Sequence, residues 1–173
     1  MAEHLFVDET KERGFLLTAV RVRPQELDIA RKAVRELVLP GQRRLHFTSE
    51  RDSRRRQALG ALMPLAVDAM IYDAGSRPRR QQRELCLRRL VADAISAGVR
   101  MIVLEQDDSV MELDRRLLFQ RVRELDCDSL EYRHFRATEE PLLAIPDAVA
   151  WCWQRGGPWR ARVRPLVSAV QTV

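Results

Sequence analysis

His4-Leu-Phe-Val-Asp8 consists largely of apolar, strand-forming residues and ends in an acid. The polar residues 9–14 follow and end in Gly14, which suits a hairpin loop. The next segment, Phe15-Leu-Leu-Thr-Ala-Val-Arg-Val22, is again rich in strand-forming residues. We therefore predict two antiparallel strands joined by a hairpin, with Asp8 at the end of the first strand.

Beyond residue 22 the sequence changes to helical periodicity alternating with short apolar runs. We expect helices near residues 25–39, 79–97, 110–125 and 142–155, and strands near 65–73, 101–105 and 130–135. Residues 42–63 are ambiguous: Leu45-His46-Phe47 is a candidate strand, and a helix is expected to run on to Pro64. The tail, residues 158–173, has no clear pattern.

Helices that separate successive strands favour parallel pairing, whereas the opening hairpin is antiparallel. The simplest architecture is a mixed five-stranded α/β sheet flanked by helices, with a helical insertion at about residues 25–63. We expect residues 1–173 to form a single domain, because a chain of this length supports one core.

The composition limits the classes of function. Hydrophobic residues make up 46% of the chain, as in globular proteins, and the net charge of +5 favours polyanionic partners such as nucleic acid. Three widely spaced cysteines form no metal-binding motif, and the sequence has no signal peptide and no apolar run long enough for a membrane span. We therefore expect a cytoplasmic protein that does not enter a membrane; a homodimer is possible.

Four acids fall at places that this strand order would bring together: Asp8, Glu84, Glu105 and Asp147. Carboxylates held close together repel one another, and a divalent cation relieves that repulsion. Each acid also has a simpler interpretation. Asp8 could begin the hairpin turn, and Glu84 could pair with Arg80 or Arg88 one helical turn away. Glu105 could be an ordinary residue at a strand exit, and Asp147 an acid that favours a helix start.

The element order, with acids at these four places, resembles the ribonuclease H-like fold. That resemblance implies one acid on the first strand, one on the first core helix, one at the end of the fourth strand and one on the last helix. Asp8, Glu84, Glu105 and Asp147 match these places in turn. Glu105 departs from the pattern, because Asp is more usual there and Glu is longer by one methylene.

Two local segments resemble a bacterial family, the domain-of-unknown-function family 3800. Phe6-Val7-Asp8-Glu9-Thr10 is similar to the family's Asp-Glu-Ser/Thr opening. Ile145-Pro146-Asp147-Ala148-Val149-Ala150-Trp151 is similar to its closing helix, with Pro146 in place of Ala, and Glu139-Glu140-Pro141 precedes it. These segments bracket nearly the whole chain.

The resemblance to ribonuclease H implies a two-metal nuclease, in which Mg²⁺ or Mn²⁺ assists hydrolysis of a phosphodiester. Asp8 would bridge the ions, Glu105 and Asp147 would each hold one, and Glu84 would reach in from its helix. Glu140 is a further possible ligand. Glu9 ranks below Asp8 because strand alternation turns it to the opposite face, and His46 is a possible proton carrier.

Arginines could follow a phosphate backbone, or they could simply form solvated helix faces. The candidates for binding nucleic acid are Arg51, Arg54, Arg55, Arg79 and Arg80. Three hypotheses follow from the sequence. The chain is a metal-dependent nuclease, a catalytically inactive nucleic-acid-binding module on the same scaffold, or a protein-interaction module whose acids lie on the surface.

Overall fold

A six-stranded mixed sheet forms the centre of the protein in the computed structural model, which describes residues 3–173. The strand order is β5-β4-β1-β2-β3-β6. The strands are β1 (His4–Thr10), β2 (Leu16–Val22), β3 (Val67–Asp73), β4 (Met101–Glu105), β5 (Glu131–Phe135) and β6 (Val167–Thr172). Only β2 runs against the others, because β1 and β3 both pair with it in antiparallel fashion.

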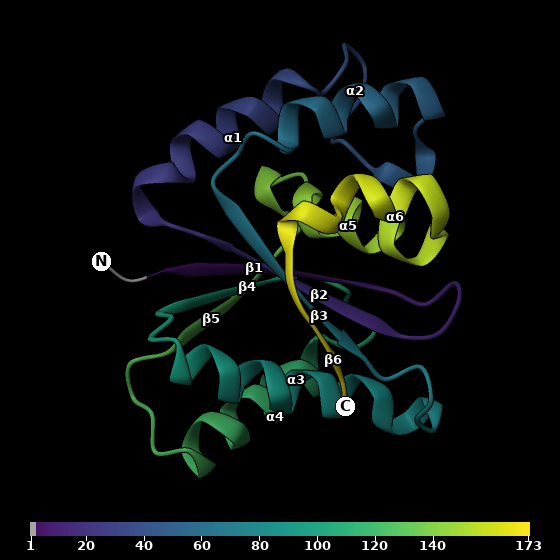
Figure 1. Ribbon diagram of the computed structural model, residues 1–173. Helices are drawn as coiled ribbons and strands as arrows, with labels where there is room; N and C mark the ends of the chain where they lie inside the picture. Colours follow the sequence, from purple (N-terminus) through teal and green to yellow (C-terminus); the bar gives the residue numbers. More distant parts are fainter. Residues whose placement is uncertain (1–2) are drawn as a thin grey trace.

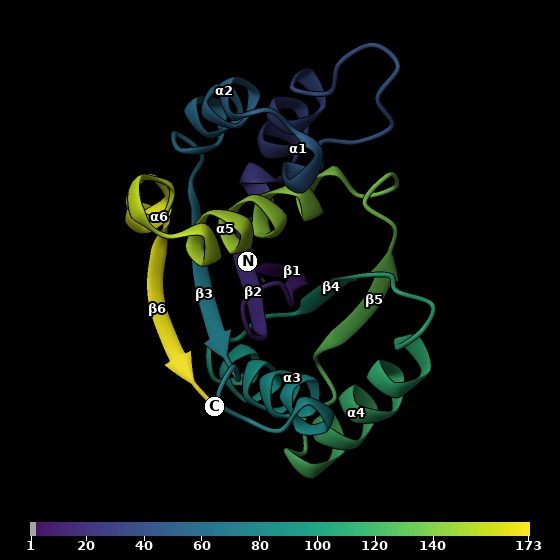
Figure 2. The same ribbon diagram turned by 90° about the vertical axis from the view of Figure 1, so that its right-hand side faces the viewer.

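The predicted mixed α/β sheet with an antiparallel start and parallel later strands is confirmed, with one correction. The sheet has six strands rather than five, because the tail of the chain forms β6 and pairs in parallel with β3 at the sheet edge. Figure 2 shows β6 at this edge. Three of its six residues are exposed and its apolar pattern is weak, so only the pairing with β3 identifies the segment as a strand.

Helices cover both faces of the sheet (Figure 1). One face carries α1 (Leu27–Glu36), α2 (Asp52–Leu62), α5 (Ala144–Arg155) and α6 (Gly157–Val163), and the other carries α3 (Arg79–Ser96) and α4 (Met111–Glu124). Each face has its own buried apolar cluster. Alternation along β1 divides its side chains between them: Phe6 belongs to the cluster beneath α5, whereas Leu5 and Val7 belong to the cluster above α3.

Between β2 and β3 the chain forms the helices α1 and α2 and two short 3₁₀ turns, Pro24–Glu26 and Phe47–Ser49. The candidate strand at Leu45-His46-Phe47 is not formed. Leu45 and Phe47 are both buried in the helical layer, and the Phe47 ring packs edge-on against Trp151 of α5, with ring centroids 5.7 Å apart. These two side chains are therefore apolar because they pack against helices, and not because they lie in a strand.

Within residues 3–173, no helix combines the length and the apolar character that a crossing of the bilayer requires.

Candidate acidic site

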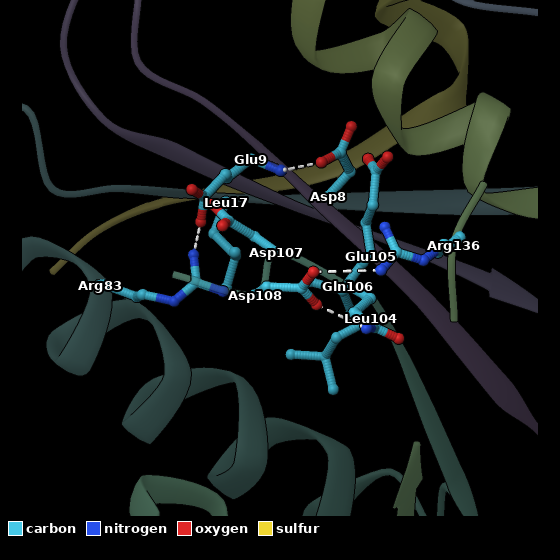
Figure 3. Close-up of a pocket in the computed structure, with 11 residues that line it drawn as sticks. Asp8, Glu9, Leu17, Arg83, Leu104, Glu105, Gln106, Asp107, Asp108 and Arg136 are labelled. Atoms are coloured by element: carbon cyan, nitrogen blue, oxygen red, sulfur yellow. Dashed lines mark hydrogen bonds and ion pairs between the residues drawn. The ribbon is translucent and has the colours of Figure 1, made fainter. Parts of the chain in front are cut away.

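Asp8 and Glu105 lie side by side where the pairing of the parallel strands β1 and β4 ends, although β1 itself continues past Asp8 to Thr10. The register of β1 and β4 ends with Val7 opposite Leu104, so the next residue on each strand is an acid. Asp8 shares the face of Phe6, and Glu105 shares the face of Val103, whose side chains both belong to the cluster beneath α5. Figure 3 shows the two carboxyl groups pointing in the same direction.

Asp147 approaches the same place from above, in the first turn of α5. This helix packs across β1 and β2. The Oδ2 of Asp147 accepts a hydrogen bond of 2.8 Å from the backbone N–H of Phe47, in the segment between β2 and β3. Three acids that are widely separated in the sequence therefore meet at one end of β1.

The acids perturb one another. Burial, followed by the charges of Glu105 and Asp147, raises the pKa of Asp8 well above its usual value. Burial also raises the pKa of Asp147, although the Phe47 N–H and the nearby His46 and Arg44 oppose this shift. Burial, together with repulsion between the acids, therefore disfavours the ionised forms of Asp8 and Asp147.

The hydroxyl group of Thr18, near these acids, has no hydrogen-bond partner within residues 3–173. Thr18 lies opposite Asp8 in the hairpin register, and directly opposed residues of antiparallel strands project to the same face. Its side chain is fully buried. Sequence analysis did not single out Thr18, because nothing local distinguishes it from an ordinary strand threonine.

The segment that links α1 and α2 supplies cationic groups to the cluster. Arg44 Nη1 lies 3.0 Å from Glu105 Oε1. His46 exchanges a hydrogen bond of 3.0 Å between its Nδ1 and Ser49 Oγ, and its charge, when present, acts on Asp147. His46 was a candidate from the sequence, whereas the pairing of Arg44 with Glu105 was missed, since it joins residues 61 positions apart.

Glu84 is not brought to the cluster. It is exposed on α3, which covers the opposite face of the sheet from α5. The match of Glu84 to an acid of the first core helix is therefore corrected: this side chain lies on the other side of the sheet from Asp147. The proposed pairing of Glu84 with Arg80 or Arg88 does not occur among the ion pairs of residues 3–173 either.

Two other candidate ligands have different partners. Glu140 caps the 3₁₀ turn Pro141–Leu143 through the Leu142 N–H and forms a bidentate ion pair with Arg31 of α1. Burial and the charge of Arg31 lower the pKa of His4, and the charge of Glu140 opposes this shift, so Glu140 is close to His4. His4 lies four residues before Asp8 on β1, a separation of roughly 13 Å. Glu9 faces away from Asp8, as strand alternation requires, and pairs with Arg83 and Lys11.

The candidate nucleic-acid-binding arginines divide into two groups. Arg54 and Arg55 are engaged within the protein: Arg54 contacts the Leu37 carbonyl and Glu50, and Arg55 donates to the Phe47 and Thr48 carbonyls. The Arg55 guanidinium also lies 4.1 Å above the Trp151 ring. These two arginines are therefore not available as ligands for phosphate. Arg51, Arg79 and Arg80 are exposed.

An open cavity of about 450 Å³, which we call the acidic cleft, lies at the edge of the sheet formed by the carboxyl ends of β1 and β4. Its lining includes the acids Asp8, Glu9, Glu105, Asp107 and Asp108 and the arginines Arg83 and Arg136. Figure 3 shows Arg136 beside Glu105, and Arg83 reaching toward Glu9. Both guanidinium groups are paired, Arg83 with Glu9 and Asp114 and Arg136 with Asp108, so a phosphate would have to replace one of these partners.

The donor set suits a hard divalent cation, but its geometry is not that of a closed metal site. Carboxylate oxygens are the ligands that Mg²⁺ prefers, and the unpartnered Thr18 hydroxyl indicates that the polar groups here are incompletely satisfied. However, within residues 3–173, no three His, Cys, Asp or Glu side chains are gathered closely enough to hold an ion as they stand. Arg44 and the Phe47 N–H bind carboxylates that an ion would need.

Comparison with solved structures places this geometry in a known fold. A chain from the complex of PCNA with RNase HII of Archaeoglobus fulgidus superposes with a TM-score of 0.58 over 88% of this chain and 72% of that chain. The fold is ribonuclease H-like. The sequence identity is 12%, so the likeness concerns the fold alone.

Comparisons of sequence add nothing to this assignment. No family model matches the chain, and no curated protein matches it. The resemblance to the domain-of-unknown-function family 3800 therefore has no support beyond the two segments that suggested it.

Proposed function

We propose that the protein is a metal-dependent nuclease in which Asp8, Glu105 and Asp147 hold Mg²⁺ or Mn²⁺. The observation that carries this proposal is the meeting of three carboxylates from β1, β4 and α5 in a ribonuclease H-like fold, where two of them, Asp8 and Glu105, line an open cleft. The raised pKa values of Asp8 and Asp147 support it, because a divalent cation would stabilise the ionised carboxylates that burial and mutual repulsion disfavour.

The chain's own groups suit each part of phosphodiester hydrolysis. A bound divalent ion would polarise a phosphoryl oxygen and acidify a water molecule. Asp8, which is close to both Glu105 and Asp147, would orient the bound ion. Arg136 lines the cleft and would exchange its partner Asp108 for a phosphate oxygen. His46 uses Nδ1 to contact Ser49, which leaves Nε2 to exchange a proton beside Asp147.

The first test is calorimetric titration of Mn²⁺ into the metal-free protein and into the Asp8→Asn and Asp147→Asn variants. Glu84→Gln is the matched control, since it removes a carboxylate that lies on the other face of the sheet. We expect Mn²⁺ binding in the wild-type protein and in Glu84→Gln, and its loss in both Asn variants. Equal binding by all four proteins would show that these aspartates do not form the metal site.

The second test measures cleavage of labelled DNA, RNA and hybrid substrates with Mn²⁺ and with EDTA. We expect cleavage that EDTA stops and that both Asn variants lack. Normal cleavage by Asp8→Asn and Asp147→Asn would refute the site.

A second function is supported by the contact between Arg44 and Glu105. Because this guanidinium already neutralises one carboxylate, the fold is also suited to a nucleic-acid-binding module without catalysis. Absence of Mn²⁺ binding and of cleavage, together with salt-dependent binding of nucleic acid, would favour this alternative.

A further inference from the structure

The acidic cleft continues into a second, basic cavity at the same edge of the sheet. This cavity, of about 600 Å³, is lined by side chains from the β1–β2 loop and from the start of α3. Arg83 lines both the cleft and this cavity, so the two adjoin at that side chain. The carboxyl ends of β1 and β3 lie at the same edge, because both strands run against β2. We call this second space the basic cavity and define its basic rim as Lys11, Arg77, Arg79 and Arg80.

Part of the rim carries positive charge that the protein does not neutralise, although Lys11 is paired with Glu9. Arg83, between the two cavities, is paired with Asp114 and Glu9, so its own charge is offset. Arg79 and Arg80 are exposed, and neither forms an ion pair within residues 3–173. Arg77 donates to the backbone carbonyl of Val173. The two adjacent arginines are therefore available to an anionic ligand.

A third cavity, of about 440 Å³, adjoins the cleft on its other side. It shares Glu105, Gln106 and Arg136 with the cleft and is also lined by Arg43 and Arg44. The acids thus lie between two basic regions. An acidic cluster repels phosphates, so the affinity for a polyanion that crosses it must come from its flanks.

We propose that the basic cavity binds the phosphodiester backbone of a nucleic-acid strand whose neighbouring segment lies in the acidic cleft. Arg79 and Arg80 contact backbone phosphates, and Arg77 extends the same positive surface. This inference rests on the proposed function for the identity of the strand, but binding in the basic cavity requires neither a metal ion nor cleavage.

The test is binding of a short fluorescein-labelled single-stranded DNA, followed by fluorescence anisotropy in EDTA over a range of salt concentrations. The test variant is Arg79→Ala/Arg80→Ala. The matched control is Arg100→Ala/Arg123→Ala, which removes the same charge. Arg100 precedes β4 at the opposite edge of the sheet, Arg123 lies in the last turn of α4, and both are exposed.

We expect the test variant to bind roughly tenfold more weakly and to reduce the slope of log affinity against log salt by about 1 to 2, as for two lost phosphate contacts. The control should match the wild-type affinity within about twofold at equal salt. Charge reversal in Arg79→Glu/Arg80→Glu should weaken binding further. Circular dichroism verifies that every variant remains folded.

Equal affinities and slopes for the test and control variants would overturn the proposal. Competition by poly-glutamate as effective as competition by unlabelled DNA would overturn the assignment to nucleic acid. Failure of the nuclease proposal is seen separately, as absent Mn²⁺ binding and absent cleavage, because this assay contains neither metal nor turnover.

Discussion

At the scale of single residues, Asp8 and Glu9 are adjacent yet face opposite layers of the protein. Asp8 meets Glu105 and Asp147 beneath α5, whereas Glu9 pairs with Arg83 of α3. The cause is the two-residue period of a strand, which sends successive side chains to opposite faces. Both side chains line the acidic cleft, but Glu9 is paired there with Arg83 and Lys11, so only Asp8 belongs to the cluster with Glu105 and Asp147.

Thr18 allows a test of how well the cleft is satisfied without a ligand. A buried hydroxyl without a partner costs free energy, and valine has nearly the same shape without that group. We expect Thr18→Val to increase the free energy of unfolding of the metal-free protein by about 1 kcal/mol. Urea unfolding in EDTA measures it. A less stable variant would show that the hydroxyl has a partner, with Asp8 the nearest candidate.

Asp8 should make the metal-free protein less stable at higher pH. Its folded-state pKa is raised, so between the unfolded value, about 4, and the folded value the native state holds the extra proton. The stabilisation is complete below about pH 4 and is lost as the pH rises through the folded pKa. We expect the free energy of unfolding of Asp8→Asn to rise relative to that of the wild-type protein as the pH increases. Urea unfolding in EDTA at several pH values measures this difference. A difference that does not change with pH would contradict the raised pKa.

At the scale of elements, the segment between β2 and β3 brings Arg44 to Glu105, in the third cavity beside the acidic cleft. It is attached to α5 by the hydrogen bond from Phe47 to Asp147 and by the edge-on packing of Phe47 against Trp151. The Trp151 ring in turn contacts Trp159 of α6, with centroids 5.3 Å apart. The position of Arg44 beside Glu105 therefore depends on packing between helices rather than on the sheet.

Arg44 competes with a metal ion for Glu105, since both are cations on the same carboxylate. We expect Arg44→Gln to tighten Mn²⁺ binding by about fivefold, the equivalent of the 1 kcal/mol or less that a partly exposed ion pair contributes. Calorimetric titration measures the affinity, and Arg43→Gln, at the exposed neighbouring arginine, is the control. Weaker Mn²⁺ binding in Arg44→Gln would mean that Arg44 instead orders the ligands.

At the scale of the whole molecule, the sheet separates two surfaces of different character. Glu84 and the start of α3 lie on one side, and the cluster of Asp8, Glu105 and Asp147 lies on the other. The acidic cleft and the basic cavity adjoin at Arg83, at the edge formed by the carboxyl ends of the strands. A strand that contacts both must therefore follow this edge.

Binding of Mn²⁺ should stabilise the entire fold, because its ligands come from β1, β4 and α5. At a free concentration of about 100 times Kd, we expect a gain of ~2.7 kcal/mol, or an increase in Tm of about 5–10 °C for a chain of this size. Thermal unfolding with and without Mn²⁺ measures it, and Asp8→Asn should show no such increase. An equal shift in Asp8→Asn would place the ion elsewhere.

Local sequence patterns were sufficient to determine most of the fold. The hairpin, the apolar run Met101–Glu105 and the helical periodicity of residues 79–97 appear in the structure within a few residues of their expected bounds. Apolar periodicity is set by which face of an element is buried, so it is visible in the sequence. The same alternation placed Asp8 and Glu9 on opposite faces.

Only the tertiary structure decided which residues and elements contact one another. Glu84 has the expected place along the chain, but the side of the sheet on which α3 packs separates it from Asp147. The strand β6 exists because β3 offers it an edge, and Arg44 reaches Glu105 because α1 and α2 pack beside α5. These contacts join residues far apart in the chain. They depend on the packing of whole elements, which the order of residues in any one segment does not determine.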